Sequence, residues 1–514
     1  MSETKITAGA EELHEGGQLK ARRLGIDTSQ ESIIYMRQDC PLCRSEGFTA
    51  HRRVQVRNNN HAVVATLNVV TSEILNPGEA GLSDAAWAAL DIKEGDVVAV
   101  HHPAPVASLA HVRSKIYGNR LDLSAFEDIL NDVVSGRYSD IQLSAFVSGC
   151  AGARLDRDEM QSLTQAMVDV GDRLTWGSTP IVDKHCVGGL PGNRTTPIVV
   201  AIVASHGLTM PKTSSRAITS PAGTADTMEM LAPVELNEAA MRRVVETEGG
   251  CIVWGGAVRL SPADEILIRI ERALDIDSEG QLVASVLSKK IAAGSTHLVL
   301  DMPVGPTAKV RSDDAARELG DDMVRVAHEF GLLAHTVMTD GSQPVGRGIG
   351  PALEARDVLA VLQAAKDAPQ DLHDRAARLA GEILEMVKLA EVGTGTALAA
   401  ATIADGSAWK KFVAICEAQG GMREPPTAAH TRVVRASRPG RVTSFDNRKL
   451  AKVAKLAGAP TAGAAGIDLH CVLGDSVGKD DPLYTIHAET PGELDYACDF
   501  AAANAGVINL GTKQ

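Results

Sequence analysis

The stretch Asp183–Pro197 constrains the fold more than any other part of the sequence. It reads Asp-Lys-His-Cys-Val-Gly-Gly-Leu-Pro-Gly-Asn-Arg-Thr-Thr-Pro and follows the apolar residues Pro180–Val182. An apolar run, a glycine-rich turn and a hydroxyl residue before proline predict a strand, a loop and a helix that starts at Thr196-Pro197. Glycines and helix amides suit an anion, and Lys184 adds a full positive charge. On this stretch alone, an anion site and a plain turn without ligand are equally good interpretations.

A second stretch, Lys212–Asp226, repeats the pattern. It contains six hydroxyl residues and an arginine around another predicted helix start at Ser220-Pro221. A Ser/Thr-rich loop can simply cap its own helix. Two helix starts with cationic and hydroxyl residues nevertheless favour a pocket for a small anion over two caps.

Three competing motifs are weaker. A Walker loop requires Gly-Lys-Ser/Thr after its glycines, whereas here Asn193 and Arg194 follow Gly192 and the lysine precedes them. Cys40-Pro-Leu-Cys43 has no second ligand pair at zinc-site spacing, so two chance cysteines are the preferred interpretation. Cys186 is either a thiol activated by Lys184 and the helix start, or a residue standing where a small hydroxyl would serve.

The length of 514 residues exceeds what one hydrophobic core supports and predicts several domains. Strand-like alternation at 53–57 and 62–70, with a short helix at 84–90, indicates a β-rich N-terminal domain over 1–103. Helical periodicity then predicts the first part of a helical domain over 104–180. Strands alternating with helices predict a mixed-sheet α/β phosphate-binding domain with a helical-domain return over 181–430, and 431–514 is expected to be a small α+β domain.

The composition limits the classes of partner that the chain is expected to bind. The formal net charge of −14 and 3% aromatic residues disfavour nucleic acid and membrane surfaces. Eight scattered cysteines and the lack of an apolar run long enough for a bilayer predict a soluble, cytoplasmic protein.

The two stretches resemble the thymidine/pyrimidine-nucleoside phosphorylase family, and in particular its long branch, which holds AMP phosphorylases and putative thymidine phosphorylases. The similarity covers about Val106 to the C-terminus. It is carried by four motifs: Lys-His-Cys-Val-Gly-Gly at 184–189, Ser-Arg-Ala-Ile-Thr-Ser at 215–220 with Gly223-Thr224, Leu-Ser-Pro-Ala-Asp at 260–264, and Gln281–Lys290.

The resemblance implies a helical domain facing an α/β domain, a homodimer or higher homo-oligomer, inorganic phosphate as co-substrate, and no metal or organic cofactor. It places phosphate near Lys184, Cys186, Thr196, Ser214 and Thr224. It places the nucleoside or nucleotide near His185, Gly189, Ser215, Arg216, Ala217, Ile218, Thr219, Ser220, Ser285, Lys289 and Lys309. Asp277 matches the proton donor of the AMP-phosphorylase pattern, and His185 is a second candidate acid.

The sequence also departs from the short branch, which has serine at the position of Cys186 and a base-binding arginine where simple counting gives Glu271. Arg216 is a natural partner for a 5′-phosphate. Phosphorolysis of thymidine to thymine and 2-deoxyribose 1-phosphate therefore stands beside phosphorolysis of a nucleoside 5′-monophosphate to ribose 1,5-bisphosphate. A magnesium-dependent phosphoribosyltransferase and a non-catalytic nucleotide binder are more distant alternatives.

Overall fold

The computed structural model describes residues 18–177, 179–188, 190, 192, 194–217, 219–276, 278–504 and 506–511. Internal contacts divide these residues into two units. The first contains 18–114 and 131–146, and the second contains 115–130 and 147–511.

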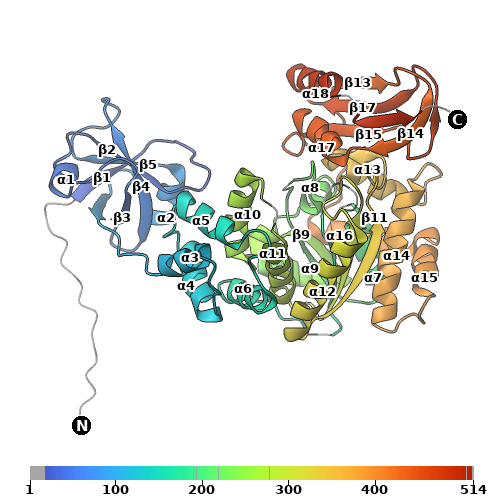
Figure 1. The fold of residues 1–514 in the computed structure, drawn as a ribbon, viewed down its shortest axis with the longest axis horizontal. Coiled ribbons are helices and arrows are strands. Elements are labelled where there is room, and N and C mark those ends of the chain that lie inside the picture. The colour runs from blue at the N-terminus through green and yellow to red at the C-terminus, as the bar shows by residue number, and fades with distance from the viewer. Residues whose placement is uncertain are drawn as a thin grey trace, which may run out of the picture. The chain divides into compact units, whose positions relative to one another are not determined.

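The N-terminal strands close into a barrel in the order β1-β5-β2-β4-β3-β6, drawn in blue in Figure 1. Alternate residues of these strands, such as Val54, Val56 and Leu67, are fully buried in its core. The predicted strands 53–57 and 62–70 and the predicted helix 84–90 are confirmed. The elements are β1 Gln18–Arg23, β2 Ile33–Arg37, α1 Pro41–Ser45, β3 Arg53–Arg57, β4 Ala62–Val70, β5 Glu79–Leu82, α2 Asp84–Leu90 and β6 Val97–His101.

Amphipathic helices follow the barrel in the chain. In the helix 123–134 the apolar face predicted from period 3.6, including Phe126, Ile129 and Val133, is buried. Later helices of the second unit pack on α6, and α11 makes the most extensive of these contacts. The bounds are α3 Leu109–Ile116, α4 Leu123–Val134, α5 Asp140–Cys150, α6 Arg157–Asp169, α10 Pro262–Leu274 and α11 Glu279–Ala292.

A parallel sheet forms the centre of the second unit. Strands pair in the orders β11-β10-β7 and β8-β9, and a parallel bridge between Ile181 and Thr209 joins the two groups. The predicted mixed sheet is therefore parallel in this part, because each strand returns through a helix. The strands are β7 Val182–Cys186, β8 Met210–Ser214, β9 Gly250–Trp254, β10 His297–Val304 and β11 Leu333–Asp340. The surrounding helical elements are α7 Thr195–Ser205, α8 Thr224–Glu229, α9 Glu238–Glu248, η1 Gly255–Val258, α12 Asp313–Glu329, α13 Pro351–Leu362, α14 Gln370–Met386, α15 Gly395–Ala404 and α16 Ser407–Gln419.

Antiparallel pairing is confined in the second unit to the C-terminal strands and to one short strand from earlier in the chain. β12 Gly348–Ile349 pairs with β15 in the sheet β12-β15-β17-β13, and a smaller sheet has the order β16-β14-β18. β12 thus ties the segment between β11 and α13 to the C-terminal module. The remaining elements are β13 His430–Arg435, β14 Gly440–Phe445, α17 Asn447–Leu456, β15 Gly466–Leu469, β16 Ser476–Val477, β17 Pro482–Ala488, α18 Pro491–Ala503 and β18 Ile508–Gly511.

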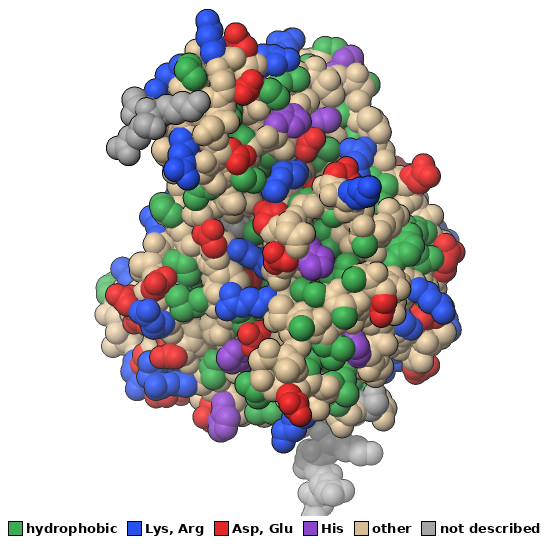
Figure 2. Space-filling view, turned by 90° about the vertical axis from the view of Figure 1, so that its right-hand side faces the viewer, with side chains coloured by type: hydrophobic (Ala, Val, Ile, Leu, Met, Phe, Trp, Pro, Cys, Tyr) green, Lys and Arg blue, Asp and Glu red, His purple; other side chains and the backbone are tan. Residues whose placement is uncertain are grey.

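On the face drawn in Figure 2, basic and acidic side chains are interspersed. Of the helices in the described part of the chain, none is long and apolar enough to cross a membrane.

Candidate active site

Lys184 lies on β7 and is fully buried near the carboxyl edge of the parallel sheet. Its Nζ donates to Thr195 Oγ1 at 2.7 Å and to Thr196 Oγ1 at 3.5 Å. Asp301 Oδ2 on the neighbouring β10 lies 3.9 Å from the same nitrogen. Ligands of open α/β sheets bind at this edge, where loops and helix starts converge. The arrangement provides a desolvated positive charge beside a helix N-terminus.

The helix after the glycine-rich loop begins earlier than predicted. α7 starts at Thr195 with Arg194 as its N-cap, so Thr196 and Pro197 lie in its first turn. The Thr195 hydroxyl makes no cap, because it donates to the Gly192 carbonyl at 2.8 Å and accepts from Lys184. Thr195 is therefore a site residue that the sequence reasoning missed, and the adjacent pair of threonines was the only signal for it.

Gly192 closes this loop against Cys186 and Asp301. A Cβ added to Gly192 would lie 2.7 Å from Cys186 Sγ and 3.0 Å from Asp301 Oδ2, so this contact requires glycine. Asp301 Oδ1 accepts from Thr339 Oγ1 at 2.6 Å, whereas Oδ2 has no hydrogen-bond partner among the described residues. An unpartnered buried carboxylate oxygen next to Lys184 helps to hold the positive charge in place.

Burial, assisted by the negative charge of Asp301, raises the pKa of Cys186 to about 12. Low-dielectric surroundings outweigh the attraction of Lys184, which favours the neutral thiol over the thiolate that a nucleophile requires. The position of Cys186 remains compatible with the ligand contact that the resemblance implies.

We accordingly expect Cys186→Ser to keep kcat/KM within about tenfold of wild type, since a hydroxyl can donate where a neutral thiol does. Steady-state phosphorolysis with varied phosphate measures this ratio. Loss of all turnover in a folded Cys186→Ser protein would instead support the interpretation of Cys186 as a nucleophile.

Asp183 gathers two lysines behind the loop. Its Oδ1 accepts from Lys212 Nζ at 3.0 Å, and Lys290 Nζ lies 2.8 Å from Oδ2. Lys212 Nζ also donates to the Lys184 carbonyl at 2.9 Å. Burial alone would raise the pKa of Asp183, but Lys212 and Lys290 together hold it below its usual value. This cluster fixes the backbone that carries Lys184 and escaped the sequence reasoning.

His185 follows Lys184 on β7. Burial and the charges of Lys290 and Lys212 hold the pKa of His185 well below its ordinary value. This shift favours the neutral imidazole, which can donate one hydrogen bond to a ligand.

The predicted residues Ser285 and Lys289 lie together on α11, and α10 brings Asp264 to them. Lys289 Nζ donates to Ser285 Oγ at 3.4 Å, one turn away on α11, and to Asp264 Oδ2 at 2.6 Å on α10. Asp264 is the last residue of the Leu-Ser-Pro-Ala-Asp motif and orients the ammonium group. The sequence analysis identified the motif but did not predict that its aspartate contacts Lys289.

The second loop also begins its helix later than predicted. α8 starts at Thr224 with Gly223 as N-cap, not at Ser220-Pro221, and Ser220 Oγ instead donates to the Ala222 carbonyl at 2.8 Å. The reason is Asp226, whose Oδ2 accepts from the amides of Gly223 at 2.8 Å and Ala217 at 2.7 Å.

At the end of β8, Ser214 Oγ is buried without a hydrogen-bond partner among the described residues. The Ser215 carbonyl accepts from the Ala225 amide at 3.3 Å, so this strand end lies against the start of α8. A buried hydroxyl that has no protein partner has free capacity for a ligand. The buried hydroxyl of Ser214, next to the start of α8 at Thr224, is consistent with the phosphate role that the resemblance gives to these two residues.

Arg216 is engaged by three carboxylates. Its guanidinium lies 2.6 Å from Glu229, 3.0 Å from Glu235 and 3.3 Å from Asp226, and it covers the Trp254 ring at 5.1 Å. The hydrogen bonds that Arg216 donates to Glu229 raise the pKa of Arg216 further above its usual value. Arg272 Nη2 donates to the Ala217 carbonyl at 3.0 Å, which brings a second guanidinium to this loop.

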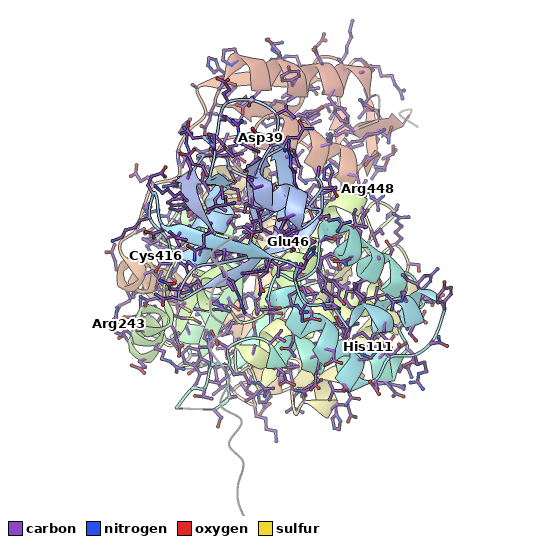
Figure 3. The ribbon with its side chains drawn as sticks, turned by 90° about the vertical axis from the view of Figure 1, so that its left-hand side faces the viewer. Asp39, Glu46, His111, Arg243, Cys416 and Arg448 are labelled. Carbon is purple, nitrogen blue, oxygen red and sulfur yellow. The ribbon has the colours of Figure 1, made fainter. Side chains whose placement is uncertain are left out.

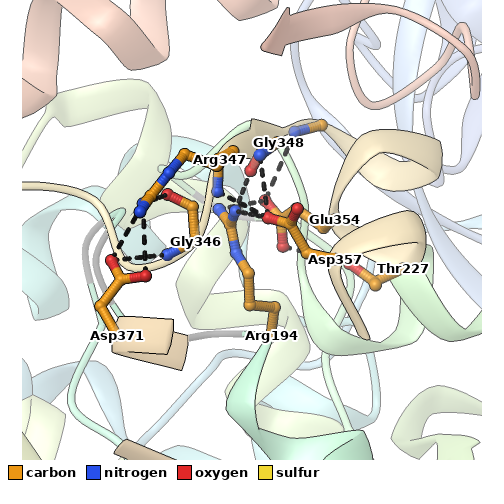
Figure 4. Close-up of polar contacts among 9 residues, drawn as sticks. Arg194, Thr227, Gly346, Arg347, Gly348, Glu354, Asp357 and Asp371 are labelled. Carbon is orange, nitrogen blue, oxygen red and sulfur yellow. Dashed lines mark hydrogen bonds and ion pairs between the residues drawn. The ribbon is translucent and has the colours of Figure 1, made fainter. Parts of the chain in front are cut away.

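A buried arginine anchors the start of α7. Figure 4 shows Arg194 pointing at the Gly348 carbonyl and at two carboxylates of α13. Its Nη1 lies 3.0 Å from Asp357 Oδ2 and its Nη2 lies 3.3 Å from Glu354 Oε1. Burial raises the pKa of Glu354 to about 7 against the lowering effect of Arg194. Because Gly348 belongs to β12, this cluster links the glycine-rich loop to the C-terminal sheet.

The remaining predicted residues are placed as follows. Lys309 lies beside the first loop, where its Cδ is 3.9 Å from a Cβ added to Gly188, and Thr219 is exposed. Gly189, Ile218 and Asp277 lie outside the described residues. Within the described part of the chain, no three His, Cys, Asp or Glu side chains form a group that could hold a metal ion.

Comparison with known proteins identifies the relatives of the chain. The model of the glycosyl transferase family α/β domain matches residues 178–409, that of its helical bundle domain matches 110–171, and that of the pyrimidine nucleoside phosphorylase C-terminal domain matches 441–507. Among similar structures, anthranilate phosphoribosyltransferase from Thermus thermophilus is 19% identical with a TM-score of 0.49, covering 60% of this chain and 98% of its own.

Similar full-length proteins are closer in sequence. The "Putative thymidine phosphorylase" of Polaromonas sp. is 61% identical over 96% of each chain, and that of Maricaulis maris is 59% identical over 99% of this chain and 98% of its own. These matches span the barrel, the helices, the parallel sheet and the C-terminal module together. The chain is a pentosyltransferase and belongs to the thymidine/pyrimidine-nucleoside phosphorylase family.

Proposed function

We propose that the protein splits the base–sugar bond of a free nucleoside with inorganic phosphate, as in the conversion of thymidine and phosphate to thymine and 2-deoxyribose 1-phosphate. The observation that carries the proposal is the buried Lys184 ammonium, which contacts Thr195 and Thr196 in the first turn of α7. A lysine and helix amides facing one point suit a small oxyanion.

The reaction develops two opposite charges at once, a positive charge on the sugar and a negative charge on the leaving base. The sugar becomes cationic as the bond breaks, so the phosphate must wait beneath the anomeric carbon while negative charge grows on the base. Lys184 supports the phosphate. Lys289, held by Asp264 at 2.6 Å, is the cation we assign to the leaving base.

Charge near Arg216 favours a free nucleoside over its 5′-monophosphate. One guanidinium faces the carboxylates of Asp226, Glu229 and Glu235, so the group carries net negative charge before any ligand arrives. A dianionic 5′-phosphate would have to displace these carboxylates, whereas an uncharged 5′-hydroxyl would not. We therefore propose that Arg216 shapes the second loop and does not receive a phosphate.

The test is base release from thymidine, uridine, adenosine and their 5′-monophosphates, with and without phosphate, in magnesium or in EDTA. We expect phosphate-dependent release from pyrimidine nucleosides in EDTA, with kcat/KM at least about tenfold above that for the monophosphates. Failure of every substrate to release base would end the phosphorylase proposal. Release from monophosphates alone would replace it with a nucleotide phosphorylase that forms ribose 1,5-bisphosphate, and a magnesium requirement would favour phosphoribosyl transfer.

A further inference from the structure

The N-terminal barrel contains a pair of cysteines that the phosphorylase chemistry does not use. Cys40 precedes α1 as its N-cap, and Cys43 lies in the first turn of that helix. Both are free thiols with exposed fractions of 7% and 6%. Cys43 Sγ reaches the barrel core, where it lies 4.0 Å from Met36 Sδ.

The backbone places the two cysteines in one helical turn. The Arg44 amide donates to the Cys40 carbonyl at 3.2 Å, and this bond closes a helical turn around the Cys40–Cys43 segment. Residues three apart in such a turn have Cα atoms about 5–6 Å apart, inside the range that a disulfide spans. Joining the sulfurs therefore requires side-chain rotation and no movement of the barrel strands.

The pair is electronically asymmetric. Hydrogen bonding from the Cys43 thiol and from nearby amides outweighs burial and lowers the pKa of Cys40, while the same contact raises the pKa of Cys43. Burial raises the pKa of the other six cysteines, at positions 150, 186, 251, 416, 471 and 498. Cys40 thus differs from every other thiol of the chain in favouring the thiolate.

Cys40 lies just below the surface of the barrel. The neighbours Asp39 and Pro41 are both exposed, and Figure 3 labels Asp39 and Glu46 on the loop and helix end that flank the pair. The Asp39 carboxylate opposes a nearby thiolate, but Arg37 binds it through two hydrogen bonds of 2.7 Å.

A zinc site is the main competing interpretation. Zinc requires four ligands, and among the described residues Cys40 and Cys43 belong to no group of three potential ligands. The nearby imidazole of His102 is turned to Phe48, at 4.7 Å between ring centroids, and to Glu46 at 3.4 Å.

We propose that Cys40 and Cys43 form a redox-active dithiol that exchanges with a low-molecular-weight disulfide such as oxidised glutathione. The Cys40 thiolate attacks one sulfur of that disulfide, the S–S bond breaks, and one glutathione thiolate leaves and takes up a proton. Cys43 then loses its proton and attacks Cys40 Sγ, which forms the internal disulfide and releases the second glutathione. Two electrons pass from the dithiol to glutathione, and excess reduced glutathione reverses both steps.

The test uses the full-length protein equilibrated at pH 7 with defined ratios of reduced and oxidised glutathione, then alkylated and analysed by peptide mass spectrometry. We expect loss of the two thiols Cys40 and Cys43 to alkylation, a Cys40–Cys43 linked peptide, and full recovery with excess reduced glutathione. Circular dichroism should show the same fold in both forms.

Three variants separate the steps. Cys43→Ser should accumulate glutathione on Cys40, Cys40→Ser should leave Cys43 unmodified, and Cys416→Ser should behave like wild type because that thiol is buried elsewhere. Both thiols remaining alkylatable in excess oxidised glutathione would overturn the proposal. So would a stoichiometric zinc ion in the purified protein that Cys40→Ser removes, or glutathione spread evenly over all eight cysteines.

Discussion

Replacing Lys184 by methionine should lower kcat/KM for phosphorolysis by about 10³-fold, as loss of one preorganised anion donor does in other enzymes. Methionine keeps the length and volume of the side chain but removes the charge that contacts Thr195 and Thr196. Most of the effect should appear in the dependence of rate on phosphate concentration, which initial-rate measurements at varied phosphate resolve.

Loss of any buried lysine can destabilise a protein, so a matched variant is required. Lys115 is 3% exposed and its Nζ lies 2.5 Å from Glu159 Oε1, and this pair belongs to α3 and α6 and not to the strand or helix that flank the glycine-rich loop. Lys115→Met should unfold at a lower temperature than wild type, yet keep kcat/KM within about tenfold while folded. Equal losses of activity in the two variants would show that Lys184 acts through stability alone.

Local pattern was sufficient to predict much of the fold. Alternation at Arg53–Arg57 and Ala62–Val70 and the short helix at 84–90 were predicted from signals within a few residues, and the structure follows them. The family resemblance, which covers about Val106 to the C-terminus, added the expectation of a helical domain facing an α/β domain. Closure of the barrel was not predictable in this way, because strand order depends on pairings between distant segments.

The site shows the same difference between local sequence signals and contacts between distant segments. Lys184 was identified from its own neighbourhood of glycines and hydroxyls. The partners that hold the loop, including Asp301 and Lys290, come from strands and helices about one hundred residues later and carry no local signal. The helix starts were misplaced because Lys184 and Asp226 occupy the hydroxyls and amides that a cap-plus-proline rule assigns to capping.

Arg194→Met should lower the free energy of unfolding by about 3–5 kcal/mol, the cost of leaving buried carboxylates without their cation. Arg194 is 1% exposed and lies between Asp357 and Glu354, which are 8% and 1% exposed. Urea unfolding monitored by tryptophan fluorescence measures the loss. Arg347→Met is the matched control, because Arg347 pairs with Asp371 at 3.2 Å in the same cluster but is about one-third exposed. That variant should lose no more than about 1 kcal/mol.

The stability that Arg194→Met loses relative to wild type should also increase with pH. Burial already raises the pKa of Glu354 to about 7 and raises that of Asp357, and Arg194 opposes both shifts. A carboxyl whose pKa is higher in the folded state stabilises the fold below its unfolded pKa and loses that contribution as pH rises through its folded pKa. Removing Arg194 raises the folded pKa values further, so the variant goes on losing stability to a higher pH than wild type does. The difference in free energy of unfolding between wild type and Arg194→Met should therefore be larger at pH 8 than at pH 6. A gap that is the same at both pH values would mean that Arg194 supports the α7 start by packing, and not by balancing the charges of Glu354 and Asp357.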